Sequence, residues 1–523
     1  MIALEQRETK LLVSIHGWSS VILGMLLYAV VLTGTVAVLA KEIGYWSASS
    51  PIKRVPFSHP INDIVQKLSK KVGRAYREDV SVTFNLDGNM SVFFHKHFKN
   101  TQGFTRDKGV VFYVNPKTGD VLQRKEATSL ELRNNDQMTT LKRFLIDTHV
   151  RLYMPAPWGL LVTGILGLVM MLSAVTGLFI HRHLLRNIFT LRKREKSALE
   201  QRDKHSVAAS WGLPFTFLLA FTGCFFSFAG SFGIPALAMV AFGGNQAELV
   251  RTVMGSNFLR PGRRVRTSNL DDILQASQTR AGSIARSLSI EHFGRKNAVV
   301  TITHKPKYGS LEGKTFQYNG VDGSFKRKLP RVGVVPSMGE KIVNVIGPLH
   351  FGNFAGVFSK AIWVALGFSS CYIILSGMTL WARRREEKIG WRAFERLIHV
   401  FGLGLPIATA ASAVSFFVFF GTPAVVNAVP LGFVFALALV LLISFFLDSH
   451  RLKSLLWSAL GILLLSLPVF RFLSLDLGWL EALEQGAVTV IGIDLLLILS
   501  GFICLRLGIK KPASAAVPAL QTS

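Results

Sequence analysis

Residues 158–180 read WGLLVTGILGLVMMLSAVTGLFI, an unbroken apolar run without a charged side chain. A helix needs roughly 20 such residues to cross the hydrocarbon core of a bilayer, so this run predicts a transmembrane helix. Further runs of similar length and character lie at about residues 15–39, 208–232, 361–382, 397–420, 427–447, 454–471 and 487–507. The sequence therefore predicts a mainly α-helical membrane protein with about eight transmembrane helices.

The composition agrees with a protein that contacts a lipid bilayer. Half of the 523 residues are apolar, and the 39 Phe far outnumber the 8 Tyr. The formal net charge is +28, yet the basic residues lie between the apolar runs and form no nucleic-acid-binding pattern. The three cysteines stand singly inside apolar runs, which disfavours iron–sulfur and thiolate-zinc sites. We expect the lipid bilayer, and no nucleic acid, as a partner.

The first apolar run also resembles a secretory signal peptide, because small residues end it just before Lys41. It is longer than the usual apolar core of such a peptide. It also opens with His16, Gly17 and Trp18, a motif that returns in altered form later in the chain. We predict that the run is retained as the first transmembrane helix.

The short loops indicate the orientation, because Lys and Arg concentrate in loops that stay in the cytoplasm. Basic clusters lie at Arg182–Lys204, Arg383–Arg396, Arg451–Lys453 and Lys510–Lys511, whereas the other short loops are neutral or acidic. All of these clusters fall on one side if both termini are cytoplasmic. Two long segments, 41–148 and 243–350, then lie on the outer side.

The two outer segments share one pattern and are each predicted to be a small α+β domain. Each opens with a short amphipathic helix, at Ile61–Val65 and at Leu270–Leu274. Alternating strands follow, and each segment ends in a strand–turn–strand with its turn at 115–120 or 319–323.

The repeat continues into the membrane helices. His16 precedes Gly34 by the same distance as His205 precedes Gly223, and His149 and His350 stand at matching places before Gly177 and Gly377. The core is thus a duplicated helix–domain–helix unit, near 1–195 and 196–390. The predicted units are a first helix (1–40), an outer domain (41–148), a second helix with a cytoplasmic loop (149–195), a third helix (196–242), a second outer domain (243–350), a fourth helix (351–390), helices five to eight (391–508) and a cytoplasmic tail (509–523).

Histidines at the ends of these helices are the main candidate metal ligands. The pattern places His16 and His205 near the cytoplasmic face and His149 and His350 near the outer face. Bis-histidine haem needs an imidazole above and below the ring, so this layout suits two haems stacked across the membrane. Glycines at 34, 177, 223 and 377 leave room for a flat macrocycle. The alternative is that such histidines only reach the interface and that the glycines serve helix packing.

The outer segments hold weaker candidates. His95 and His97 fall on one face of a strand, where they could bind a metal or simply be exposed. The basic cluster Arg260, Arg263, Arg264 and Arg266 could bind an anionic partner or be a solvated loop. The chain has no GxGxxG after a strand, P-loop, nucleophile elbow or HExxH, so it shows no means of binding nicotinamide or ATP.

Several runs resemble a known family. TGLFIHR at 176–182, IFTLR at 188–192, DKH at 203–205 and LPF at 213–215 are similar to the PepSY-associated transmembrane helix proteins, which are bacterial iron-regulated inner-membrane proteins. The resemblance covers about 1–390 and implies that the outer segments are PepSY-like domains.

Understood members of that family are di-haem reductases of ferric siderophores at the periplasmic face. The resemblance implies two haems b held by His16, His149, His205 and His350, with His181 as the substitute at the inner face. It also implies that a ferric siderophore is reduced to release Fe(II), with electrons from a quinol or a separate cytoplasmic donor. Two alternatives stay open, a transporter, for which Asp494 is the intramembrane charge to test, and a non-enzymatic PepSY regulator of peptidases.

Overall fold

The computed structural model describes residues 5–48, 60–84, 89–99, 105–180, 197–254, 262–305, 313–330, 333 and 335–509. Within these residues, eight helical spans are long and apolar enough to cross a membrane, which confirms the prediction and makes the chain a multi-pass membrane protein. These spans are α1 (Gln6–Ala37), α6 (Trp158–Ile180), α8 (Ser197–Phe228) continued through the π-helical turn Ala229–Gly233 into α9 (Ile234–Phe242), α13 (Gly356–Arg383), α14 (Ile389–Val418), α15 (Val425–Ser444), α16 (Ser449–Leu475) and α18 (Val488–Ile509).

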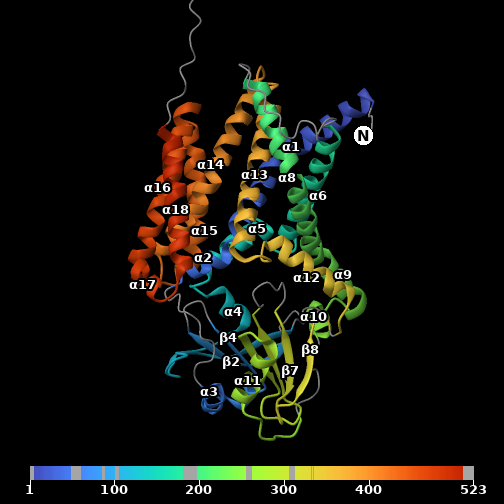
Figure 1. Cartoon of the computed structure of the whole chain (residues 1–523), viewed down its shortest axis with the longest axis vertical. Coiled ribbons are helices and arrows are strands. Elements are labelled where there is room, and N and C mark those ends of the chain that lie inside the picture. Colours follow the sequence, from blue (N-terminus) through green and yellow to red (C-terminus); the bar gives the residue numbers. More distant parts are fainter. Residues whose placement is uncertain are drawn as a thin grey trace, which may run out of the picture.

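The molecule consists of a layer of long helices and a β-sheet domain at one end of them (Figure 1). The beginning of α1 and the end of α18 both lie at the end away from the sheet. Two shorter helices, α5 (Thr140–Arg151) and α12 (Met338–Phe351), lie between the long helices and the sheet. The two ends of the helical layer therefore differ, because only one of them bears the sheet domain.

Many large apolar side chains on the long helices point outward. Phe435 on α15 is 71% exposed and Leu499 on α18 is 61% exposed. A helix that is apolar all round needs an apolar surrounding, which lipid provides.

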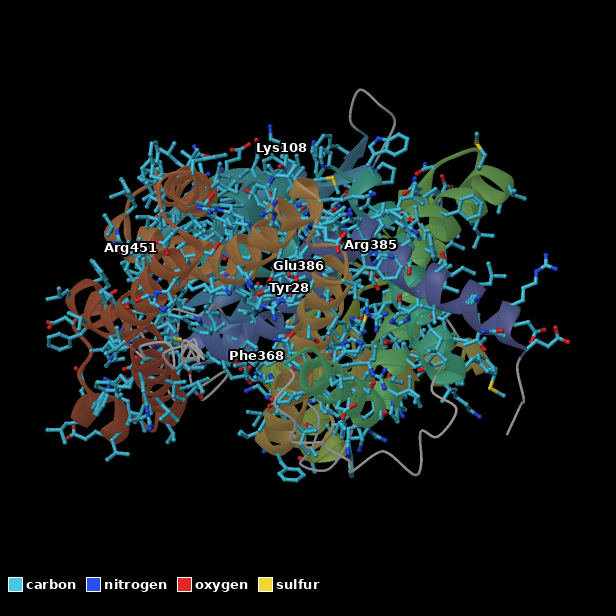
Figure 2. All side chains as sticks on the ribbon, turned by 90° about the horizontal axis from the view of Figure 1, so that it is seen from above. Tyr28, Lys108, Phe368, Arg385, Glu386 and Arg451 are labelled. Carbon is cyan, nitrogen blue, oxygen red and sulfur yellow. The ribbon has the colours of Figure 1, made fainter. Side chains whose placement is uncertain are left out.

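Helix α1 contacts α5, α6, α13 and α14. Its Tyr28 is 3% exposed, donates a 2.6 Å hydrogen bond to the carbonyl of Gly402, and lies near the middle of the helices in Figure 2. At Gly24 an added Cβ would lie 2.6 Å from the sulfur of Met378. Glycine therefore allows α1 and α13 to approach closely.

The strands of both outer segments form one eight-stranded antiparallel sheet in the order β4-β3-β2-β1-β5-β6-β7-β8. The turns predicted at 115–120 and 319–323 join β3 to β4 and β7 to β8. The strands are β1 (Asp79–Phe84), β2 (Met90–Lys99), β3 (Thr105–Val114), β4 (Val121–Thr128), β5 (Ala285–Glu291), β6 (Val299–His304), β7 (Thr315–Asn319) and β8 (Phe325–Leu329).

The two halves of the sheet, predicted as two domains, meet where β1 pairs with β5. Each of these strands would be an exposed edge in a separate four-stranded domain, and pairing them satisfies both edges. The short helices α3 (Ile61–Ser69) and α11 (Leu270–Ala281) supply apolar side chains to one core shared by both halves. Asp271 on α11 accepts hydrogen bonds from the backbone N–H groups of Ile61 and Asn62, so one half caps a helix of the other.

Helices α14, α15, α16 and α18 form a bundle beside the duplicated unit (Figure 1). A buried ion pair lies in it, between Arg471 and Asp494 at 2.9 Å. Asp494 also accepts hydrogen bonds from the indole N–H groups of Trp46 and Trp479. The bundle is thereby fixed to α2 (Ala40–Trp46), the short helix that follows α1, and to α17 (Trp479–Glu484).

Candidate functional site

His16 and His205 line one cavity among the membrane helices. They come from α1 and α8, the equivalent helices of the two repeats, and the cavity measures about 590 Å³. Gly177 and Gly377 also line it. The structure therefore brings together the pair that the sequence analysis placed near the cytoplasmic face.

His149 and His350 form the second pair, on the side of the sheet domain. They come from α5 and α12, also equivalent in the two repeats. Their ring centroids are 6.3 Å apart and their ring planes differ by 26°. Phe226 contacts the His350 ring at 5.5 Å between centroids.

Each of the four imidazoles lies against a glycine of a neighbouring helix in its own repeat. A Cβ added at Gly34 would lie 2.7 Å from Cε1 of His149, and one at Gly377 would lie 3.1 Å from Cε1 of His205. At Gly177, facing His16, and at Gly223, facing His350, the distance would be 3.5 Å. The glycines that were predicted to leave room for a macrocycle leave room in the structure for the histidine rings.

A hydrogen bond at Nδ1 orients each ring. Thr176 and Ser376 place their hydroxyls 3.1 Å from His16 and 3.0 Å from His205. Thr222 lies 2.8 Å from Nδ1 of His350, and His149 instead contacts the carbonyl of Val30 at 3.0 Å. Among the residues that the structure describes, Nε2 of these rings has no hydrogen-bond partner, which leaves it available as a ligand.

Sequence reasoning missed the role of these hydroxyls, although a signal was present. A Ser or Thr directly precedes each of the four glycines, as Thr33, Thr176, Thr222 and Ser376. All four hydroxyls donate to a carbonyl of their own helix. Those of Thr176, Thr222 and Ser376 also contact Nδ1 of a histidine.

The outer pair is held in the uncharged form. Burial, together with the neighbouring His149, lowers the pKa of His350 to about 3. Burial also lowers the pKa of His149, against a contact with the Val30 carbonyl that raises it. Neutral imidazole is the form that binds a metal ion.

Among the other inner candidates, His181 lies outside the described residues. Trp381, which takes its place in the second repeat, lines the cavity and lies against Gly17, where an added Cβ would overlap the indole at 1.8 Å. Arg202 and Arg384 line the same cavity. The cavity thus combines two imidazoles with two guanidinium groups.

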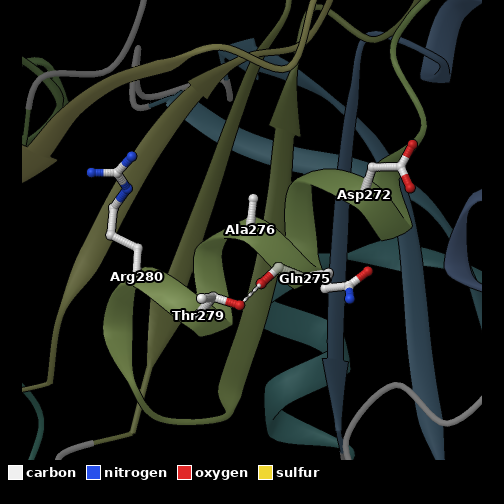
Figure 3. A pocket seen from close by; sticks show the side chains of 5 residues that line it. All are labelled: Asp272, Gln275, Ala276, Thr279 and Arg280. Carbon is white, nitrogen blue, oxygen red and sulfur yellow. Dashed lines mark hydrogen bonds between the residues drawn. The ribbon is translucent and has the colours of Figure 1, made fainter.

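On the sheet domain, Arg263, Arg264 and Arg266 are exposed, and Arg264 forms a β-bridge to Arg295; Arg260 lies outside the described residues. A hollow of about 540 Å³ lies on α11 along Asp272, Gln275, Ala276, Thr279 and Arg280 (Figure 3). There, Thr279 donates to the carbonyl of Gln275 in its own helix, and Arg280 lies over the Phe325 ring. This hollow is open to solvent and contains none of the four histidines.

The fold and the site define a multi-pass membrane protein with a duplicated core, in which paired histidines from equivalent helices face each other. The sequence pattern of the PepSY-associated TM region matches residues 13–384. The chain belongs to this family, as the resemblance predicted. It is also 25% identical over 279 residues to an uncharacterized protein of Pseudomonas aeruginosa, PA4219, which covers 51% of this chain and 70% of that protein.

Proposed function

We propose that this chain is a di-haem electron-transfer protein that reduces a ferric siderophore, or another ferric chelate, at the outer face of a bacterial inner membrane and releases Fe(II). The observation that carries the proposal is the pairing of four oriented histidines across the two repeats. His149 with His350, and His16 with His205, would hold the two haems b.

The outer pair fits a bis-histidine haem. A metal–nitrogen bond of about 2 Å on each side of an iron, plus about 1 Å from each nitrogen to its ring centre, separates two ring centres by roughly 6 Å. The centroids of His149 and His350 are 6.3 Å apart. Gly34 and Gly223 leave free the space that a Cβ would occupy beside these rings.

The inner pair also fits a haem, and here the argument rests on the cavity that the two histidines line. His16 and His205 face a cavity that is largely apolar, as a macrocycle requires, and Arg202 and Arg384 supply cations for its carboxylate groups. When held between two imidazoles, haem iron carries single electrons at a potential set by its axial ligands and its burial.

The orientation follows from charge. The basic clusters at Arg383–Arg396 and Arg451–Lys453 belong to helix ends away from the sheet domain, so we place that side in the cytoplasm, with both termini, and the sheet domain in the periplasm. One electron from a quinol or a separate cytoplasmic donor would then reduce one ferric ion on the sheet side. The exposed arginines at 263, 264 and 266 would attract an anionic chelate there. Fe(II) binds hard oxygen ligands less tightly than Fe(III), so reduction favours release.

The transport alternative gains no support from Asp494. Its carboxylate accepts hydrogen bonds from Trp46, Arg471 and Trp479 and is fully buried, which is the arrangement of a structural charge. No contact of the described residues favours a peptidase regulator.

The deciding experiment records visible absorption spectra of the purified protein in its oxidised and reduced states. A pyridine haemochrome assay then measures its haem content. We expect about two haems b per chain, and oxidation of the dithionite-reduced protein when a ferric siderophore is added. A colourless protein from cells supplied with iron and haem would refute the proposal.

A further inference from the structure

A second set of histidines lies on the sheet, apart from the four-histidine core. One ligand atom each from Asp79, His95 and His97 lies within 4.8 Å of the other two. Asp79 on β1 pairs with His95 on β2, and His97 pairs with Asp107 on β3. Paired residues, and residues two apart on one strand, face the same side of a sheet. All four side chains therefore lie on one face.

The ring of His97 lies between two carboxylates. Its Nδ1 is 2.6 Å from Oδ1 of Asp107 and its Nε2 is 3.0 Å from Oδ2 of Asp79. A neutral imidazole has a single N–H, so if that N–H faces Asp107, the other nitrogen presents a lone pair to a carboxylate. Two lone pairs at this distance need a proton or a metal ion between them.

The surroundings suit a metal ion. The backbone N–H of His292 donates to Oδ1 of Asp79 at 3.1 Å, and Phe93 stacks on the His95 ring at 4.7 Å, so both groups are fixed in place. Asp79 and His95 are buried, whereas the His97 side chain is 43% exposed. The exposed ring provides an entry path and leaves room for a water ligand.

The distances agree with this role. Metal–ligand bonds of about 2.0–2.2 Å place two ligand atoms of a tetrahedral site roughly 3.4 Å apart. The contact between Asp79 and His97 is already 3.0 Å. Since the His95 atom lies within 4.8 Å of both, closing the site takes a side-chain movement of about 1–2 Å at most.

We propose that Asp79, His95 and His97 bind a divalent transition-metal ion such as Zn²⁺, with Asp107 orienting the His97 ring. Two imidazoles and one carboxylate, with a position open to water, are a donor set that zinc and ferrous ions accept. A carboxylate on the far nitrogen of a ligating histidine fixes its tautomer and raises its basicity. The site shares no residue with the four-histidine core and does not depend on haem.

The test is Zn²⁺ bound by the full-length protein, purified in detergent without a histidine tag, after equilibrium dialysis and elemental analysis. We expect one equivalent of Zn²⁺ in the wild type that is missing in the His95→Gln/His97→Gln double variant. The control His450→Gln, which removes an exposed histidine on α16, should keep it.

Asp107→Asn adds a second measurement that leaves the three ligands in place. It should weaken Zn²⁺ binding about 10–100-fold, and lowering the pH should weaken binding in the wild type because the histidines must be neutral. Equal Zn²⁺ in the wild type and the double variant, or unchanged affinity in Asp107→Asn, would overturn the proposal and leave a protonated His97 bridging two carboxylates.

Discussion

The indole of Trp46 donates a 2.7 Å hydrogen bond to Asp494, a carboxylate 448 residues further along the chain. Trp46 ends the short helix after α1, and Asp494 lies within the last membrane helix. The contact therefore joins the duplicated core to the C-terminal bundle, whose four helices have no counterpart in the repeat. Arg471 is the counter-ion of Asp494 at this contact.

Asp494→Asn should strongly destabilise the protein, because it leaves the buried guanidinium of Arg471 without a counter-ion. Removal of one partner of a buried ion pair costs about 3–5 kcal/mol. The expected result is a large fall in the thermal unfolding midpoint of the detergent-solubilised protein. Glu200→Gln is the matched control, because it breaks an exposed ion pair with Lys204, which solvent screens and which therefore contributes little to stability. Equal stability of the two variants would refute the structural role.

The glycines that face the histidines should differ in their tolerance of alanine. Gly34→Ala places a Cβ 2.7 Å from His149, so the ring must move and the outer haem should be lost. Gly177→Ala places its Cβ 3.5 Å from His16, an ordinary contact, so His16 should keep its place and any loss of the inner haem should be smaller than the loss of the outer haem in Gly34→Ala. Haem content per chain and the reduced α-band measure this. The opposite order of tolerance would mean that these contacts do not position the ligands.

The proposed pairing of the histidines predicts how the haem losses of two substitutions combine. His149→Ala and His350→Ala should each remove one haem, and combining them should remove no more, because both serve the same iron. Combining His149→Ala with His205→Ala should remove both haems. His181→Ala is expected to leave the reduced α-bands of both haems unchanged. Loss of the inner haem's α-band in that variant would instead assign His181 as a ligand.

The stability of the sheet should fall in mild acid through His304. This ring is buried between Ser277, 2.7 Å from its Nε2, and the carbonyl of Ser283, 3.0 Å from its Nδ1. Burial lowers its pKa below the ordinary value of 6.5. The unfolded chain then takes up the proton first as the pH falls, so the stabilisation is full above about pH 6.5 and is lost below it.

Hydrogen exchange of the β6 amides, followed between neutral and mildly acidic pH, measures this loss. In His304→Gln the β6 amides should be less protected from exchange at neutral pH than in the wild type. Their protection, relative to the intrinsic exchange rate at each pH, should depend less on pH. An unchanged pH dependence in that variant would assign the effect to other groups.

Most of the fold could be predicted from local sequence patterns. Runs such as 158–180 define a membrane helix by length and composition alone, because a helix satisfies its backbone hydrogen bonds within the segment in lipid and a run of this length is about twice that of a barrel strand. The turns at 115–120 and 319–323 rest on local turn chemistry in the same way. Both were confirmed by the structure.

The joining of the two outer segments could not be predicted in this way. The pairing of β1 with β5 joins strands roughly two hundred residues apart. The local sequence of an edge strand does not specify which distant strand it will pair with. The same holds for the Nδ1 partners of the histidines. Thr222 and the equivalent Thr33 both donate to a carbonyl of their own helix, yet Thr222 also contacts His350, whereas Nδ1 of His149 contacts the carbonyl of Val30.

The sequence by itself determined the number of membrane helices, the duplication and the four histidines of the core, because hydropathy, period and repeat spacing are properties of the chain. Only the tertiary structure decided that His149 lies opposite His350, that one sheet serves both repeats, and that Asp494 is a structural charge. The reason is physical: these features depend on long-range packing, in which a side chain acquires its partner only when distant helices and strands meet.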